Sequence, residues 1–387
     1  MSLREEFVRL ALLEGSNIRD LCRRFGVSSS TGYKWINRYR EAGHAGLADR
    51  SRRPHRSPGR TAADVEAMVL SVRAAYPKWG GRKIKAVLER DGMIAPVPAE
   101  STITAILDRN GALDPEESAK HIPFTRFERA APNDLWQMDF KGHFATDRGR
   151  CHPLTVLDDH SRFSICLKAC GDQRGETVQG HLLASFRRYG LPWRIITDNG
   201  SPWGDSAEHP YTPLGVWLLR LDIAVSHSRP YHPQTLGKDE RFHRTLKGEL
   251  LDRRYADLEH CQRAFDAWRM IYNCRRPHQA LAMKVPVQRY RASPRTMPET
   301  LPPIEYPPGD HVRRVHNNGW ISFKGRSINF PKAFVGYPIA LRPTDIDGVW
   351  QAFFYRYLVA QVDLRHEVPH TQTARHVPEH PLAISPV

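Results

Sequence analysis

The chain has 387 residues, a formal net charge of +15 and a pI near 9.7; its length predicts two to four domains, and its charge favours a polyanionic partner such as DNA. No apolar run approaches the roughly 18 residues that a membrane-spanning helix needs. Charged residues interrupt Met1–Ser16, where a secretion signal would be apolar, so we expect a bacterial cytoplasmic, nucleoid-associated protein without a membrane partner.

Residues 1–49 are predicted to form a helix-turn-helix domain. Apolar residues recur at helical spacing from Leu3, Asn17 can cap a second helix, and a third helix follows the turn at Gly26. On this third helix Gly32 belongs to the apolar face, where an apolar side chain is expected to pack better. The opposite face carries polar and basic residues that we predict to contact double-stranded DNA: Ser30, Tyr33, Lys34, Asn37 and Arg38. The alternative is a small helical bundle with a solvated face.

Residues 50–60 are predicted to form a basic linker. The segment contains Arg52, Arg53 and Arg56, two prolines and no acidic residue. Such a segment cannot build a core, but it can follow DNA phosphates or enter a minor groove. For any single arginine, a purely solvated linker is an equally good interpretation.

Residues 61–113 repeat the helical theme and are predicted to form a second helix-turn-helix domain. Three helices are expected, the last of them capped by Ser101. Basic residues at the start of the middle helix, Arg82, Lys83 and Lys85, are candidate DNA contacts. The pattern is weaker than in the first domain because acidic residues dilute the basic face.

A linker over residues 114–132 precedes the predicted catalytic core, residues 133–295, in which short apolar runs alternate with helical patterns. The predicted strands are Leu135–Gly142, Pro153–Leu157, Phe163–Ala169, Arg194–Thr197 and Leu221–Val225. The predicted helices are Glu176–Tyr189, Thr212–Leu219, Thr235–Leu250 and Leu258–Tyr272. Three antiparallel strands followed by alternating helices and strands is the order of a ribonuclease-H-like mixed sheet.

Residues 306–364 contain short β-rich runs separated by glycine-containing turn signals, which predict a small β-barrel. Residues 365–387 are rich in His and Pro and are predicted to be disordered. The predicted fold class is therefore multidomain, with N-terminal all-α helix-turn-helix units, a central α/β ribonuclease-H-like mixed sheet and a C-terminal small β-barrel.

The six cysteines are scattered and form no Cys-x-x-Cys pair. This spacing favours reduced, mostly buried thiols over a zinc knuckle. The chain also has no Gly-x-x-x-x-Gly-Lys loop, which argues against an ATP-driven machine.

Three carboxylates carry the predicted chemistry. Asp139 and Asp198 end short apolar runs that read as strands, and Glu240 opens a helix with basic residues. If the two strands are neighbours, these acids can bind two Mg²⁺ per active site, with Mn²⁺ as a substitute, because hard cations prefer carboxylate oxygen. Arg244 and Lys247 share a helix face with Glu240, although an ordinary Glu–Arg helical pair is the alternative for that residue taken alone. The set of acids fits the cutting and joining of phosphodiester bonds.

Three further acids near these positions are assigned structural roles or no role. Asp158 and Asp159 lie in a turn signal between two strands, where aspartate commonly bonds its own backbone. Asp239 would point about 100° away from the helix face of Glu240, so we expect it not to share the same ions.

The residues around the three acids form a set of motifs: Trp136-Gln-Met-Asp139, Leu157-Asp-Asp-His-Ser-Arg162, Thr197-Asp-Asn-Gly200, Tyr231-His-Pro-Gln-Thr235, Gly237-Lys-Asp-Glu-Arg241, Thr245-Leu-Lys247 and Tyr272-Asn-Cys-Arg-Arg-Pro-His278. Together they resemble bacterial insertion-sequence transposases of the retroviral-integrase-core superfamily. More narrowly, the chain resembles the branch that carries helix-turn-helix units and the catalytic core in one reading frame. The resemblance covers about Leu3–Arg295, and the sequence departs from the family at Asp239, where a small apolar residue is usual.

The resemblance implies that Asp139, Asp198 and Glu240 are the catalytic, metal-binding acids. It also suggests DNA contacts near the active site, namely Asn199, Lys238, Arg241, Arg244 and Lys247. The implied activity is that of a DNA transposase, which binds the terminal inverted repeats of its element, cleaves the 3′ ends and transfers them into target DNA. Because two ends must be joined, a homodimer or a higher oligomer on DNA is expected.

Two alternatives stay open. A catalytically silent descendant acting as a DNA-binding regulator would share the helix-turn-helix units and the positive charge, but it would not need an intact set of three acids. A nuclease of ribonuclease-H type would not need two sequence-reading domains.

Overall fold

The computed structural model describes residues 2–49, 61–113, 128–198, 200–204, 211–227, 237–365 and 371–373. The chain divides into two compact units, Met1–Ala62 and Ala63–Val387. Four predicted DNA contacts lie outside the described residues: Arg52, Arg53, Arg56 and Asn199. No helix in the described part of the chain has the length and apolarity needed to cross a membrane.

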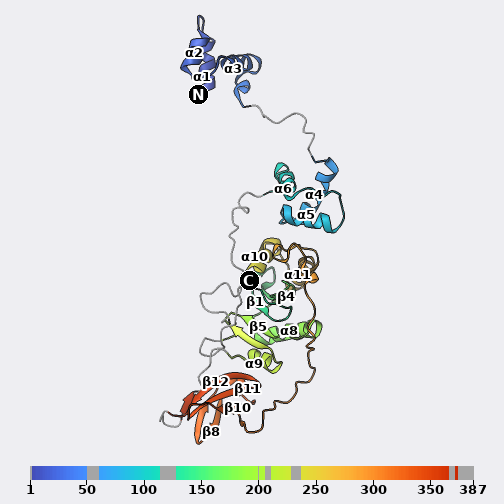
Figure 1. Ribbon diagram of the computed structural model, residues 1–387, viewed down its shortest axis with the longest axis vertical. Coiled ribbons are helices and arrows are strands. Elements are labelled where there is room, and N and C mark those ends of the chain that lie inside the picture. The colour runs from blue at the N-terminus through green and yellow to red at the C-terminus, as the bar shows by residue number, and fades with distance from the viewer. Residues whose placement is uncertain are drawn as a thin grey trace. The chain divides into compact units, whose positions relative to one another are not determined.

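The described residues of the first unit form a helical domain (Figure 1). Its elements are α1 (Leu3–Ala11), α2 (Ile18–Arg24), α3 (Ser29–Ala42) and the 3-10 helix η1 (Gly43–Leu47). The side chains of Asn17 and Ser28 accept backbone N–H groups at the starts of α2 and α3, which satisfies donors that a helix start leaves open. Phe7, Cys22 and Ile36 form the buried core between the helices. The predicted helix-turn-helix order is confirmed.

The expectation that a larger apolar residue would suit position 32 is wrong. Gly32 is buried in α3, and a Cβ atom there would lie 2.5 Å from Cys22 Sγ and 2.8 Å from Phe7 Cζ. Any larger side chain would overpack this crossing. Glycine therefore allows α3 to approach α1 and α2 closely.

The second unit begins with another three-helix segment. Its helices are α4 (Ala63–Ala75), α5 (Gly81–Arg90) and α6 (Glu100–Arg109). Val69, Ile84 and Leu107 belong to its buried core. The predicted cap at Ser101 is wrong, because α6 already begins at Glu100 and Ala99 occupies the cap position without a side-chain bond.

A mixed six-stranded sheet forms the centre of the second unit. Its strands are β1 (Trp136–Phe140), β2 (Phe144–Thr146), β3 (Gly149–Asp158), β4 (Ser164–Cys170), β5 (Arg194–Thr197) and β6 (Ala224–His227). The strand order is β2-β3-β1-β5-β6, with β4 also paired to β3. Strand β3 pairs antiparallel with both β1 and β4, whereas β5 pairs parallel with both β1 and β6. The predicted mixed sheet is confirmed, and only the three-residue strand β2 was not predicted.

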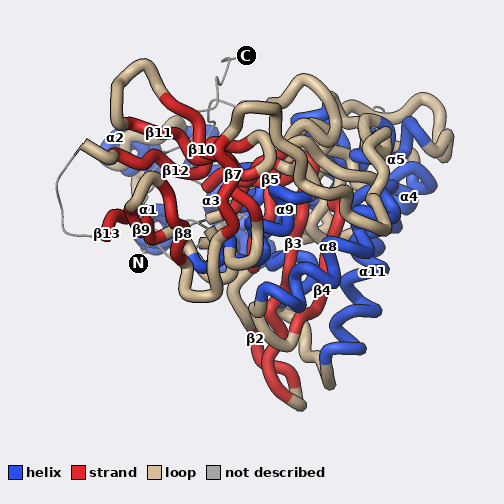
Figure 2. The backbone as a smooth tube through the Cα atoms, turned by 90° about the horizontal axis from the view of Figure 1, so that it is seen from below, coloured by secondary structure: helices blue, strands red, loops and turns tan. Residues whose placement is uncertain are grey.

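Helices cover both faces of this sheet. They are α8 (Gly175–Tyr189), α9 (Pro213–Arg220), α10 (Gly237–Leu246), which continues as the π-helix η3 (Lys247–Leu251), and α11 (Leu258–Cys274). On β3, Val156 belongs to the apolar core that includes α8 and α9, and the next residue, Leu157, belongs to the core that includes α10 and α11. Successive residues of a strand point to opposite faces, so these are two separate layers; α11 runs beside β4 in both views (Figures 1 and 2).

The C-terminal part is all β and is built as two sheets. One contains β7 (His311–Arg314), β10 (Pro338–Pro343), β11 (Val349–Phe354) and β12 (Tyr357–Asp363), and the other contains β8 (Trp320–Phe323), β9 (Arg326–Asn329) and β13 (Thr371–Thr373). Short 3-10 helices lie before and within this part: η4 (Gln279–Leu281), η5 (Pro286–Gln288) and η6 (Lys332–Phe334). The sheets share one apolar core that includes Phe334, Leu341 and Phe354, which confirms a small β domain. Strand β13 lies in the segment predicted to be disordered, so that prediction is wrong for these three residues, because they pair with β9.

Candidate active site

Asp139 and Asp198 lie beside each other at one end of the sheet. Strand β1 pairs in parallel with β5, and Gln137 stands opposite Ile196. The same register, continued past the end of β5, places Asp198 next to Asp139. Because parallel neighbours end at the same edge of a sheet, two residues 59 positions apart in the chain meet there.

The site carries negative charge that the protein only partly compensates. The pKa of Asp139 is raised to about 7, mainly by burial and then by the neighbouring charge of Asp198, with a smaller effect of Glu240. The Phe140 N–H, which donates to Asp139 Oδ1 at 2.7 Å, and the charge of Lys141 act in the opposite direction. Carboxylates that disfavour one another's ionisation form the donor set that a hard divalent cation prefers, so these residues fit the predicted metal.

The backbone around Asp198 is tied to the end of β6. His227 Nδ1 lies 2.9 Å from the carbonyl oxygen of Asp198, and the Thr197 hydroxyl donates to the same oxygen at 3.0 Å. The Gly200 N–H donates to Asp198 Oδ1 at 3.1 Å. These contacts hold the carboxylate at the edge of the sheet, next to Asp139.

Helix α10 lies at this edge of the sheet with one face exposed and the other buried. Glu240 is exposed, and so are the predicted DNA contacts Arg241, Arg244 and Lys247. The buried face carries Asp239, Phe242, His243 and Leu246. Glu240 therefore acts on Asp139 through its charge, while the residue before it is the one that packs against the sheet.

The expectation that Asp239 points away from the acids is wrong. Its side chain is buried, and the charge of Asp139 is, after burial, the main cause that raises the pKa of Asp239 well above its usual value. His243, four residues further along the same helix, lies with Nε2 at 3.3 Å from Asp239 Oδ2 and with Nδ1 at 3.9 Å from Asp139 Oδ2. Burial lowers the pKa of His243 to about 3, which leaves the ring neutral beside the two carboxyl groups.

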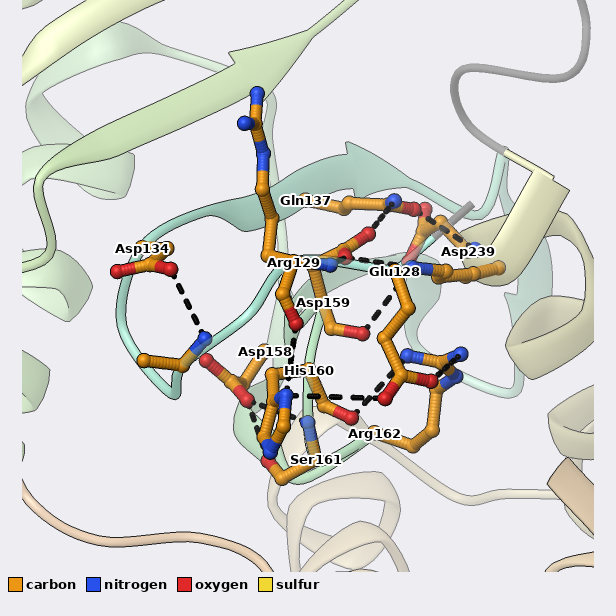
Figure 3. Close-up of polar contacts among 12 residues, drawn as sticks. Glu128, Arg129, Asp134, Gln137, Asp158, Asp159, His160, Ser161, Arg162 and Asp239 are labelled. Atoms are coloured by element: carbon orange, nitrogen blue, oxygen red, sulfur yellow. Dashed lines mark hydrogen bonds and ion pairs between the residues drawn. The ribbon is translucent and has the colours of Figure 1, made fainter. Parts of the chain in front are cut away.

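Gln137 and Asp159 connect the start of α10 to the sheet (Figure 3). Gln137 Nε2 donates to Asp159 Oδ1 at 2.8 Å, and Gln137 Oε1 accepts the Asp239 N–H at 3.1 Å. Lys238 Nζ lies 2.5 Å from Asp159 Oδ2, and only 10% of the Lys238 side chain is exposed. Burial lowers the pKa of Lys238 to about 8. Lys238, predicted to contact DNA, is thus directed inward and fixes the first turn of α10.

Asp158 bonds the backbone of its own turn, as predicted (Figure 3). Its carboxylate accepts the N–H groups of Asn133 at 2.7 Å and Ser161 at 2.8 Å, and the Ser161 hydroxyl at 2.5 Å. The side chain is fully buried. These bonds connect the β3–β4 turn to the segment that enters β1, so they support the strand that carries Asp139.

The predicted DNA contacts of the two helix-turn-helix segments differ in accessibility. On α3 the side chains of Ser30, Tyr33, Lys34 and Asn37 are exposed and that of Arg38 is partly exposed. On α5, Arg82 pairs with Glu100 at 3.0 Å and Lys85 pairs with Glu89 at 3.5 Å. Only the first segment therefore presents the whole predicted set on one accessible face.

Lys83 lies in a contact between α5 and the end of α11. Burial and the charge of Arg276 lower the pKa of Lys83 to about 7, against the opposing effect of Glu249. Nearby, Arg275 donates to the Tyr76 hydroxyl at 3.1 Å and to Asp91 at 2.7 Å. The three-helix segment α4–α6 therefore packs on the domain that contains the mixed sheet. The contact uses Arg275, which belongs to the motif Tyr272–His278 at the end of α11.

Four residues of the site were missed or misplaced by sequence reasoning. Gln137 stands two positions before Asp139 on a strand, and Asp239 stands four positions before His243 on a helix. Both spacings place side chains on one face, so the signal was present. Thr155 had no such signal, because only the strand register sets it opposite Asp139.

Comparison with family models matches five segments of the chain. Two models of an integrase core domain match residues 129–233 and 221–286. A helix-turn-helix domain matches residues 3–55, and a homeodomain-like domain matches residues 31–107. Residues 310–370 match the C-terminal domain of IS481 family transposases.

Similar curated proteins come from insertion elements and retroviruses. An uncharacterized 31.7 kDa protein of insertion element IS407 from Burkholderia multivorans is 25% identical over 214 residues, which is 54% of this chain and 74% of that protein. An uncharacterized 39.2 kDa protein of insertion element IS476 from Xanthomonas euvesicatoria is 29% identical over 43% of this chain and 46% of that protein. The Gag-Pro-Pol polyprotein of mouse mammary tumor virus is 29% identical over 31% of this chain and only 6% of its own length.

Similar solved structures are retroviral integrases. The HTLV-2 integrase catalytic core domain, solved with magnesium, covers 41% of this chain and 96% of its own, with 17% identity and a TM-score of 0.32. A simian T-cell lymphotropic virus intasome covers 78% and 100%, with 16% identity and a TM-score of 0.34.

Proposed function

We propose that this chain, which belongs to the insertion-sequence transposases with an integrase-type core, binds the ends of its element, cleaves their 3′ ends and transfers them into target DNA. The observation that carries the proposal is the meeting of Asp139 and Asp198 on adjacent parallel strands, with Glu240 on the helix beside them. The two integrase core models match segments that together contain all three acids.

Asp139, Asp198 and Glu240 would hold two Mg²⁺ per active site, for which Mn²⁺ can substitute. Bound cations would make the attacking oxygen more nucleophilic and neutralise charge on the leaving oxygen. The protein's own contribution is to hold the two aspartates in register through the sheet and to fix α10 through Lys238 and Gln137. Rigid support of this kind keeps ligands in position before substrate binds.

DNA would be bound at two places on the described chain. On α10 and its continuation η3, Arg241, Arg244 and Lys247 are exposed near Glu240, where they suit phosphates close to the reacting bond. On α3 the exposed set that contains Tyr33 suits recognition of the element ends. Joining two ends requires two active sites, so we propose a homodimer or a higher oligomer on DNA, acting on the bacterial chromosome in the cytoplasm.

The test is strand transfer by the full-length protein on a labelled duplex that carries the native element end, with Mg²⁺ or Mn²⁺. Wild type should cleave and join the end, and Asp198→Asn should do neither while still binding the duplex. Glu259→Gln is a matched control, because this α11 carboxylate is 83% exposed and pairs with Arg263 on the helix surface. Specific end binding without cleavage by wild type would instead identify a catalytically silent regulator.

A further inference from the structure

We propose that Asp139, Asp239 and His243 form a binding site for a first-row transition-metal dication, in addition to the pair formed by Asp139 and Asp198. The site uses one imidazole and two carboxyl groups, and two of its three residues come from the buried face of α10. It makes no use of Glu240 and does not depend on any reaction with DNA.

The three side chains converge closely enough to share one ion. One ligand atom from each residue lies within 4.8 Å of the others. Ligands bonded to one ion at about 2.1 Å lie at most about 4.2 Å apart, so small side-chain rotations close the set. Asp139 is the accessible member, with 28% of its side chain exposed, whereas the other two side chains are exposed by 8% or less. An ion therefore enters from the active-site edge of the sheet.

One buried oxygen of this cluster receives no hydrogen bond. Asp239 is 1% exposed, and its Oδ2 atom has no hydrogen-bond partner. Its other oxygen receives only a long contact of 3.4 Å from the Thr155 hydroxyl. A buried carboxyl oxygen that receives no hydrogen bond is costly, and Oδ2 lies 3.3 Å from His243 Nε2. A bound cation would satisfy this atom.

The hydrogen bonds around His243 leave one ring nitrogen available to a metal. The Thr155 hydroxyl donates its single hydrogen to the carbonyl oxygen of Asp139 at 2.9 Å, so it accepts from His243 Nε2 at 2.8 Å. With the proton assigned to Nε2 from this arrangement, Nδ1 presents a lone pair 3.9 Å from Asp139 Oδ2. A cation placed between Nδ1 and Asp139 Oδ2 would be bonded by both atoms, and burial disfavours a second proton on the ring.

The ligand set selects the class of ion. Mg²⁺ and Ca²⁺ prefer oxygen alone, whereas an imidazole nitrogen suits Mn²⁺, Co²⁺ and Zn²⁺. The Thr155 contact to Nε2 is the kind of supporting hydrogen bond that orients a metal-bound histidine. We therefore assign the site to a transition-metal ion, with Mn²⁺ as the test ion and Co²⁺ as a spectroscopic probe.

The experiment uses the metal alone with full-length protein and no DNA. Pulsed electron paramagnetic resonance of bound Mn²⁺ should show coupling to a directly bound nitrogen in wild type. This coupling should disappear in His243→Asn, and Co²⁺ affinity should fall at least about 10-fold in both Asp239→Asn and His243→Asn. Asp198→Asn should keep the nitrogen coupling, since Asp198 is not a ligand of this site, and the exposed-acid control Glu259→Gln should match wild type.

Absence of nitrogen coupling in wild type overturns the proposal, and this measurement needs no variant to fold. Unchanged Co²⁺ affinity in both ligand variants overturns it as well. Since no DNA is present, failure here leaves the proposed strand-transfer activity untouched, and a protein inactive in strand transfer can still show the nitrogen coupling.

Discussion

Asp139 and Asp198 stand next to each other because β1 and β5 are parallel neighbours in the sheet, although β2, β3 and β4 lie between them in the chain. The charge of Asp198 adds to burial in raising the pKa of Asp139 to about 7. The site is therefore electrostatically unfavourable when both acids are ionised. A bound divalent cation stabilises such a site. The geometry of the site therefore has measurable consequences for stability.

The first prediction concerns pH. Because the pKa of Asp139 rises from about 3.8 in the unfolded chain to about 7 in the folded protein, the folded state holds an extra proton between these values, and its stability falls as pH rises through this window. Asp139→Asn cannot ionise, so in EDTA it should be more stable than wild type at pH 8, and the difference should vanish below about pH 4. Urea unfolding at both pH values measures this; a stability difference that is independent of pH would contradict it.

The second prediction concerns the β3–β4 turn. Asp158→Ala should destabilise the second unit by about 2–4 kcal/mol, because three buried donors lose their acceptor. Chemical unfolding gives the free energy. Asp108→Ala, at an exposed position of α6, is the control and should change it by less than about 0.5 kcal/mol. A cost for Asp158→Ala as small as that of the control would show that the turn does not depend on these bonds.

A third prediction tests the close approach at Gly32. Gly32→Ala should destabilise the first unit by about 1–3 kcal/mol, although alanine is the better helix former, because its Cβ would overlap Cys22 and Phe7. Thermal unfolding of the first unit within the full chain, followed by hydrogen exchange, measures the effect. Arg40→Ala, on the exposed surface of α3, should be nearly neutral. Stabilisation by Gly32→Ala would mean that the helices can separate without cost.

The fourth prediction concerns recognition of DNA by α3. Lys34→Ala should weaken binding to the element end and reduce the slope of log affinity against log salt by about one, as expected for the loss of one phosphate contact. Arg263→Ala, on the surface of α11 and paired with Glu259, serves as the comparison and should leave affinity and slope unchanged. An unchanged salt slope for Lys34→Ala would place the DNA elsewhere on the unit.

Local sequence patterns were sufficient to locate most elements and to identify the three candidate acids. Periodicity located α8 and α11 to within two residues of their ends, and β5 as predicted, Arg194–Thr197, because apolar spacing and helix caps are local properties of the chain. The same holds for two of the three bonds of Asp158, which reach Ser161 within the turn; the third reaches Asn133, which is distant in the chain.

Which side chains share the site depends on how distant elements pack together. Asp239 and Glu240 are adjacent in sequence, and the packing of α10 on the sheet buries the first and exposes the second. Likewise, Lys238 was predicted to contact DNA but is directed inward by Asp159, which is distant in the chain. Lys83, also a predicted DNA contact, is partly buried near the charges of Arg276 and Glu249. Such roles depend on contacts between elements that are far apart in the sequence. Local spacing determines which residues share a helix face, but not which part of the protein that face packs against.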